Sequence, residues 1–258
     1  MFAKIKELAG RAAGIYKYYS DKRFTTVAGT LVYFFLMSLA PFLFWLSLFF
    51  GDVDLNSLSS FALFNAIMPI LKELQSSAVS ATSGAGIVLM ITTLYSSTNF
   101  FYHLRRSGEI IYDGKFKKGG IKLRLTSLGL IIVTAILIAG AVGAVVAGEQ
   151  ILRMVMNAYM SQFVIYSVAL VITVLVAALM NIFICPYKIS FKDVIPGSLF
   201  TVLLWLLCAG GFAVYMYFAN PVKLYGKIAS VIVFLLWCYL MMNSFVIGVI
   251  YNLSLIHI

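Results

Sequence analysis

The chain has 258 residues, of which 62% are hydrophobic and only 11% are charged, and its formal net charge is +10. Soluble domains contain about 45–50% apolar and about 25% charged residues, so the composition excludes an ordinary soluble domain. Six stretches without Lys, Arg, Asp or Glu are each longer than the ~20 residues with which a helix crosses a bilayer. The chain is therefore predicted to be an all-α, polytopic membrane protein.

The first segment, residues 1–23, is predicted to be a basic amphipathic helix on the cytoplasmic side. Apolar residues recur there at intervals of three and four, and cations fill the other positions: Lys4, Lys6, Arg11 and Lys17. Such a helix lies in the interface plane against anionic headgroups. The same periodicity equally allows a helix that merely completes the cytoplasmic surface.

Residues 24–258 are predicted to form one membrane domain of six helices, about 27–50, 84–102, 125–147, 163–185, 194–218 and 228–253. Pro41 lies in the middle of the first span and predicts a kink. Residues 55–71 are amphipathic but too short to span, so they predict short outer helices between spans one and two. Pro196 is expected in the first turn of the fifth span, where proline is tolerated.

The third predicted span is rich in small residues at intervals of four. In lipid, this spacing lets two helix backbones approach closely, which favours helix packing over a pore lining. It also permits self-association, so a homo-oligomer stays open. The residues are Gly140, Gly143, Ala144, Ala147 and Gly148.

The basic segment Arg105–Arg124 fixes the predicted orientation. It holds seven of the nineteen Lys and Arg residues: Arg105, Arg106, Lys115, Lys117, Lys118, Lys122 and Arg124. Cationic loops stay in the cytoplasm, and placing this loop there puts fifteen cations inside and four outside. Both termini are then cytoplasmic, and the cations are expected to contact anionic lipid headgroups.

Three stretches carry a resemblance to a known family. They are Val27–Leu43 with Tyr33 and Pro41, the Lys-Asp-Val-Ile-Pro-Gly run at 192–197, and Leu224–Leu240 with Tyr225-Gly226. In order and spacing the chain resembles the YihY/BrkB family of bacterial inner-membrane proteins, once misnamed after ribonuclease BN. The resemblance implies a plasma-membrane location. That family usually closes its last span with Gly-Ala-Glu, and Gly248-Val249-Ile250 stands here instead, so a coupling carboxylate is not carried over.

An enzyme is not expected. Metal-dependent cleavage of RNA needs clustered carboxylates, and metal-free cleavage needs positioned acids and bases. The acids on the predicted cytoplasmic side are scattered, and no Gly-rich phosphate loop, metal-ligand pair or nucleophile motif occurs. We therefore expect no catalytic or metal site, no cofactor and no specific nucleic-acid partner, and a ribonuclease is disfavoured.

A transport-like or structural role remains. Candidate residues for a substrate path are the polar and helix-breaking ones in or beside the spans: Tyr33, Ser38, Pro41, Asn99, Asn181, Asn220, Tyr225, Gly226, Asn243 and Asn252. The amides either form hydrogen bonds between helices or line a polar cleft. The leading hypothesis is a transporter, or a protein that translocates a lipid or amphiphilic small molecule, without its own ATPase. The alternative is a membrane scaffold that recruits partners. A cavity between spans would discriminate the two.

Overall fold

The computed structural model describes residues 13–14, 16–49, 92–93, 95–115, 122–134, 136–137, 140, 158–219 and 228–256. Within these ranges the regular elements are helices, and no strand occurs in them. The predicted all-α class is confirmed for this part of the chain. The chain divides into two compact units, one of Met1–Val32 with Leu104–Ile258 and one of Tyr33–His103.

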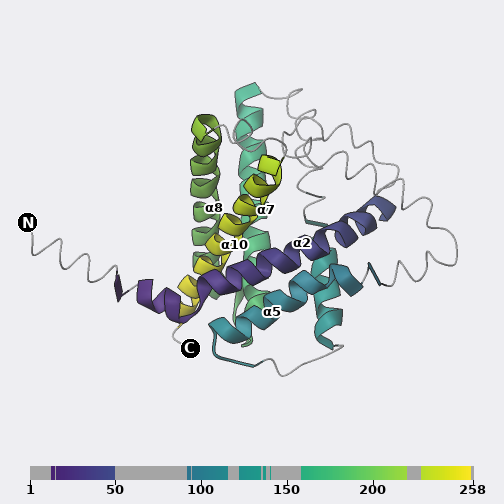
Figure 1. Ribbon diagram of the computed structural model, residues 1–258, viewed down its shortest axis with the longest axis vertical. Helices are drawn as coiled ribbons and strands as arrows, with labels where there is room; N and C mark the ends of the chain where they lie inside the picture. Colours follow the sequence, from purple (N-terminus) through teal and green to yellow (C-terminus); the bar gives the residue numbers. More distant parts are fainter. Residues whose placement is uncertain are drawn as a thin grey trace, which may run out of the picture. The chain divides into compact units, whose positions relative to one another are not determined.

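Three long apolar helices belong to the larger unit (Figure 1): α7, Ala158–Ile184, α8, Phe191–Ala219, and α10, Ile228–Ile256. At 1.5 Å per residue, each extends over about 40 Å, which exceeds the hydrocarbon thickness of about 30 Å. The windows suited to crossing a membrane are Gln162–Ile184, Phe191–Phe218 and Val231–Leu255. The predicted fourth, fifth and sixth spans are therefore confirmed as helices of membrane-spanning length and composition.

The turn between α7 and α8 follows from local sequence chemistry. α7 ends at Ile184, before the Cys185-Pro186 pair, because a residue that precedes proline disfavours the helical conformation. The N–H of Ser190 donates to Oδ2 of Asp193 at 2.9 Å, which caps the start of α8. This cap starts α8 at Phe191, three residues earlier than predicted. Pro196 is consequently the sixth residue of the helix, and its predicted place in the first turn was wrong.

The basic segment is shorter as a loop than its charges suggested. α5, Asn99–Ile111, runs seven residues into it, and residues 122–134 are helical again. The reason is periodicity: Leu104, Ser107 and Ile111 recur on one face and are buried, so the helix stays amphipathic after the apolar run has ended. The interruption was predicted from charge alone, which does not reveal this face.

The first predicted span corresponds to α2, Phe24–Phe49, with Pro41 inside it. In the smaller unit, the ring of Phe34 stacks on His103 with 3.3 Å between centroids. Of the predicted second and third spans, only residues 92–93, 95–102, 125–134, 136–137 and 140 are described. The predicted outer helices lie outside the described residues, and the count of six spans stays a prediction.

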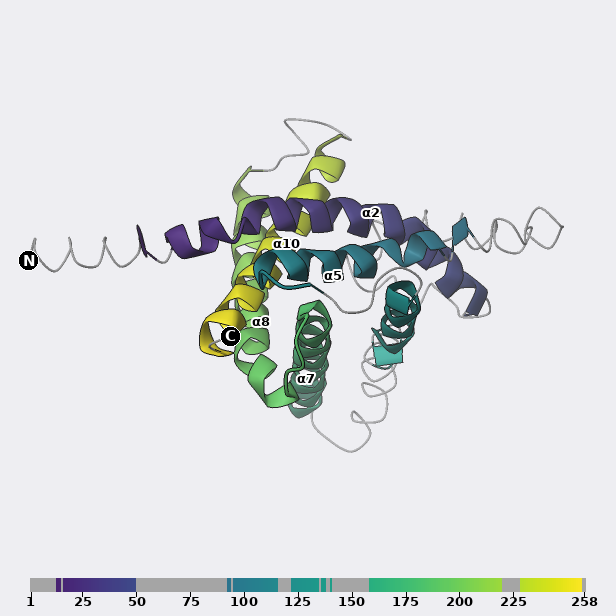
Figure 2. The same cartoon turned by 90° about the horizontal axis from the view of Figure 1, so that it is seen from below.

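α8 packs against both α7 and α10. Contacts along α8 and α10 run in opposite directions: Gly197 meets Asn252 and Cys208 meets Ser244, so the two helices are antiparallel. The C-terminal end of α10 therefore lies beside the α7–α8 turn, as both views show (Figures 1 and 2). This end of the three helices is called the turn end below.

Candidate functional site

Two predicted site residues, Asn181 on α7 and Asn252 on α10, meet at the turn end. Asn252 Nδ2 donates to Asn181 Oδ1 at 3.2 Å, and Asn181 Nδ2 donates to the Ser198 hydroxyl on α8 at 3.1 Å. All three side chains have an exposed fraction of 0%. Asn181, Ser198 and Asn252, called the amide cluster here, therefore join three helices through buried hydrogen bonds.

Asn252 also bonds to the backbone of α8 beside its proline. The Gly197 N–H donates to Asn252 Oδ1 at 2.7 Å, and Asn252 Nδ2 donates to the Val194 carbonyl at 3.1 Å. Pro196 has no N–H, so it removes one hydrogen bond from the interior of the helix. The carbonyl freed by this loss belongs to Lys192, whereas Asn252 bonds to the Gly197 N–H and the Val194 carbonyl, so it ties α10 to this part of α8 without replacing the lost bond.

Glycines make this close approach possible. A Cβ built on Gly197 would lie 2.3 Å from Asn252 Cγ, and one built on Gly248 would lie 1.9 Å from Thr201 Oγ1. A third, on Gly108 of α5, would lie 1.8 Å from the Ile184 carbonyl oxygen. Real Cβ atoms do not approach this closely, so the turn end admits no larger residue at these positions without backbone movement.

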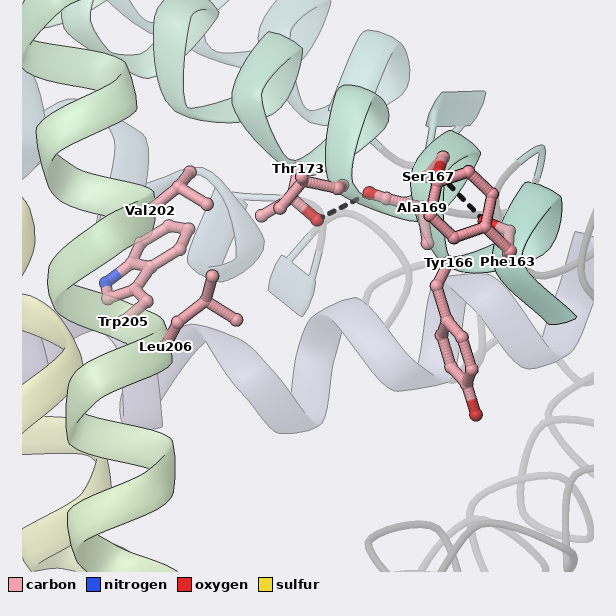
Figure 3. A pocket seen from close by; sticks show the side chains of 9 residues that line it. Phe163, Tyr166, Ser167, Ala169, Thr173, Val202, Trp205 and Leu206 are labelled. Atoms are coloured by element: carbon pink, nitrogen blue, oxygen red, sulfur yellow. Dashed lines mark hydrogen bonds between the residues drawn. The ribbon is translucent and has the colours of Figure 1, made fainter.

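A groove lies between α7 and α8, farther from the turn (Figure 3). Its volume is about 460 Å³. In Figure 3, Trp205 and Leu206 on α8 lie across from Thr173 and Ala169 on α7. The nine residues of this α7–α8 groove are Phe163, Tyr166, Ser167, Ala169, Leu170, Thr173, Val202, Trp205 and Leu206.

The polar atoms of the groove lining are largely satisfied within the protein. The Ser167 hydroxyl donates to the Phe163 carbonyl at 2.8 Å, and the Thr173 hydroxyl donates to the Ala169 carbonyl at 2.8 Å. Trp205 Nε1 donates to the Met241 carbonyl of α10 at 2.9 Å. The groove therefore presents methyl, aliphatic and aromatic surface, which suits an apolar ligand.

None of the nine groove residues was among the residues predicted from sequence. The predicted residues in the smaller unit are Tyr33, which is exposed, Ser38, which donates to the Phe35 carbonyl, and the half-buried Pro41 and Asn99. On α10, Asn243 Nδ2 donates to the Tyr239 carbonyl, and its Oδ1 is buried without a partner among the described residues. Asn220, Tyr225 and Gly226 lie outside the described residues.

The described cations have differing surroundings. Arg105 donates to the Thr126 hydroxyl at 2.9 Å and lies 4.7 Å above the Phe183 ring, and Arg106 pairs with Glu109 at 2.7 Å. Lys17, Lys115 and Lys122 are exposed and Arg124 is half-buried. The remaining predicted lipid contacts, Lys4, Lys6, Arg11, Lys117 and Lys118, lie outside the described residues.

In the described residues, close contacts between helices occur at glycines outside the predicted third span, and the prediction of helix packing through that span stays a prediction. Gly140 is exposed with open space around it, while Gly143, Ala144, Ala147 and Gly148 lie outside the described residues. The missed signal is on α10, where Ser244, Gly248 and Asn252 recur every four residues and so share one face. That face meets α8 through Thr201 and Cys208.

Tyr112, which follows α5 directly, is buried, and burial raises the pKa of its hydroxyl well above its usual value. In the described ranges, no three His, Cys, Asp or Glu side chains are grouped closely enough to hold a metal ion.

A family model described as virulence factor BrkB matches residues 15–257, nearly the whole chain. The chain belongs to the BrkB family. The resemblance drawn from the sequence motifs is thereby confirmed. Together with the three long apolar helices, membership identifies this BrkB-family chain as a membrane protein.

Two relatives show how far the similarity extends. The BrkB-family chain is 28% identical over 227 residues to the Bacillus subtilis protein YfkH, named ribonuclease-like, and the match covers 81% of this chain and 82% of that protein. It is 39% identical over 54 residues to a UPF0761 membrane protein of Pseudoalteromonas translucida, which covers 20% and 18% of the two chains. No solved structure matches.

Proposed function

We propose that this protein translocates a lipid or an amphiphilic small molecule across the bacterial inner membrane, without an ATPase of its own. The single observation that carries the proposal is the α7–α8 groove, because a translocating protein needs space between its spans. Its apolar lining favours a molecule with a hydrocarbon part over a bare ion, which would lose its hydration there.

The proposed topology has six spans, with both termini and the basic segment in the cytoplasm. Its support is the placement of cations, because fifteen of nineteen then lie on the cytoplasmic side. The test attaches a membrane-impermeant thiol label to single cysteines introduced at Lys115 and Asp54 in a cysteine-free variant. In intact cells, the position 54 variant is expected to react and the position 115 variant to stay unlabelled. Labelling at position 115 would contradict the topology.

The translocation test uses proteoliposomes that contain a phospholipid with a fluorescent headgroup label. A membrane-impermeant reductant quenches the outer leaflet at once, and further quenching reports lipid that crosses the bilayer. Protein-containing vesicles are expected to lose the protected fluorescence faster than vesicles without protein. Equal rates would contradict lipid translocation.

A groove-filling variant, Ala169→Phe, is expected to slow the transfer of lipid in the same assay. Val171→Phe, on the exposed surface of α7, serves as its control.

The alternative function, a membrane scaffold, is favoured by a different observation. Two of the predicted cavity residues, Asn181 and Asn252, form buried hydrogen bonds between helices in the amide cluster and so do not line a cavity. This is expected of a protein whose helices pack without a cavity. A scaffold would keep its partners when the groove is filled. Unchanged growth and partner recovery with Ala169→Phe, together with no translocation by the wild type, would select this alternative.

We further propose that the protein is not an enzyme, although one relative carries a ribonuclease-like name. The proposal rests on the sequence, where the acidic residues of the predicted cytoplasmic side are scattered over separate segments. Purified protein incubated with RNA and Mg²⁺ or Mn²⁺ is expected to leave the RNA intact. Cleavage above a mock-purified control would overturn the proposal.

A further inference from the structure

We propose that the α7–α8 groove holds one acyl chain of a membrane phospholipid, with the methyl end of the chain beside Trp205 and its carbonyl end toward Tyr166. The inference rests on the proposed function and names the molecule that the groove takes. It also gives the orientation of that molecule, which the proposed function leaves open.

The chemistry of the lining selects hydrocarbon. The hydroxyls of Ser167 and Thr173 are bonded to carbonyls of α7, and the indole N–H of Trp205 is bonded to α10. These groups have no free donor to offer, so a ligand rich in acceptors, such as a carboxylate or a phosphate, would lose its bonds to water without gaining replacements. A saturated or unsaturated chain loses nothing in the same place.

The length of the groove matches one leaflet. Its residues on α7 run from Phe163 to Thr173, which is about 15 Å of helix at 1.5 Å per residue. This is half of the hydrocarbon thickness of about 30 Å. A chain that extended across the whole bilayer would need a longer groove.

The two ends of the groove differ, and this difference orients the chain. Beyond Thr173, α7 approaches α8 closely: Ala177 and Ala178 are buried, and Asn181 bonds to Ser198. At the other end Tyr166 is 70% exposed, and its ring extends away from α7 with the hydroxyl at the tip (Figure 3). Tyr166 lies about 27 Å along α7 from Ile184, at the depth where tyrosines contact the interface. In the proposed topology this end faces the outer leaflet.

The test uses Trp205 as a built-in reporter. In a Trp45→Phe, Trp237→Phe variant, Trp205 is the remaining tryptophan. The full chain is placed in bilayers of phosphatidylglycerol brominated either near the methyl end or near the carbonyl end of the chain. Quenching is expected to be stronger with bromine near the methyl end. The quenching of Trp205 is also expected to exceed that of a single tryptophan placed at Leu207 in a variant without Trp205. Leu207 is exposed on α8 outside the groove.

Filling the groove should remove this excess. Ala169→Phe, and independently Thr173→Phe, are expected to reduce quenching of Trp205 to the level seen at Leu207→Trp, whereas Val171→Phe leaves it unchanged. Gel filtration and thermal unfolding of each variant verify folding, and two blocking positions guard against the failure of one. Equal quenching of Trp205 in the parent and in the groove-filling variants would overturn the inference. A lack of quenching because another segment of this chain covers Trp205 would also overturn it.

The same preparations separate this inference from the proposed function. Excess quenching without lipid transfer in the fluorescence assay would leave the acyl-chain site standing and remove translocation. Lipid transfer that persists in both blocked variants, with no excess quenching in the parent, would remove the acyl-chain site and leave translocation standing.

Discussion

The turn end of α7, α8 and α10 and the α7–α8 groove are built from the same helices but by opposite means. At the turn end, small residues and amides bring the backbones together, and the amide cluster is fully buried. About 12 Å farther along α7 from Asn181, at Thr173, the facing side chains are larger and the helices leave a groove. At the turn end, amide hydrogen bonds join neighbouring helices, whereas in the groove the hydroxyls of Ser167 and Thr173 bond to their own helix and leave mostly apolar surface.

The close packing of the turn end limits how far a molecule in the groove could move along the helices. A chain seated in the groove meets closely packed helices at its deep end, where Asn252 and Asn181 hold α10, α8 and α7 together. Passage toward the turn end would require these buried hydrogen bonds to break. The proposed acyl-chain site would therefore serve one leaflet, and the amide cluster is the part that would have to open for the proposed transfer to the other.

The largest effect is expected when a glycine at the turn end is enlarged. Gly197→Ala and Gly248→Ala are each expected to lower the free energy of unfolding by about 3 kcal/mol, because the added methyl meets backbone or side-chain atoms that cannot withdraw. Chemical denaturation in mixed micelles gives the value. Gly210→Ala, where the added Cβ has open space, should be neutral or slightly stabilising. A loss at Gly210→Ala as large as that at Gly197→Ala and Gly248→Ala would contradict the tight packing of the turn end.

Removing an amide is the next largest perturbation. Asn252→Leu removes the side-chain acceptor of the Gly197 N–H and the donor to Asn181 and to the Val194 carbonyl, which keeps its bond from the Ser198 hydroxyl, and is expected to cost about 1–3 kcal/mol. Asn243→Leu is the matched control on the same helix, with one intrahelical hydrogen bond to lose and a smaller expected cost. The same denaturation measurement compares them. Quenching of Trp205 by brominated lipid should survive in Asn252→Leu, since the groove is a separate part of the structure.

A double-mutant cycle sharpens the assignment of that cost. Asn181→Ala and Asn252→Ala, singly and together, are expected to show a coupling free energy of about 0.6–1.7 kcal/mol, the range of hydrogen bonds between membrane helices. Additive effects would mean that the two amides act through α8 alone and do not bond to one another.

The smallest effect is expected in the groove. Thr173→Val keeps the shape of the side chain and removes a hydroxyl that bonds to its own helix, so stability should change by less than about 0.5 kcal/mol. Lipid transfer and Trp205 quenching should both persist. A large loss of either would indicate that the Thr173 hydroxyl recognises the ligand, which would contradict an apolar occupant.

Much of the architecture was predictable from particular sequence features. Helices of spanning length at α7, α8 and α10 follow from apolar stretches that are too long for a soluble domain, and the end of α7 follows from Cys185-Pro186. The start of α8 was predicted three residues late, because the cap formed by Ser190 and Asp193 was not used. The family was predictable from motifs around Tyr33, Pro196 and Trp237. The helical start of the basic segment was missed, because charge was used as the marker of a loop while the buried face through Leu104 and Ile111 continued.

For the candidate site as well, some features follow from the sequence and others only from the tertiary structure. Composition and cation placement alone determined that this is an all-α membrane protein and suggested its orientation, because hydrophobic burial and charge exclusion act on each segment by itself. Only the tertiary structure decided which amides meet and where space remains. Asn181 and Asn252 are 71 residues apart in the chain, and the groove residues have no motif or charge that distinguishes them from other residues of the spans. Contacts and voids depend on how helices approach one another, which no single helix encodes.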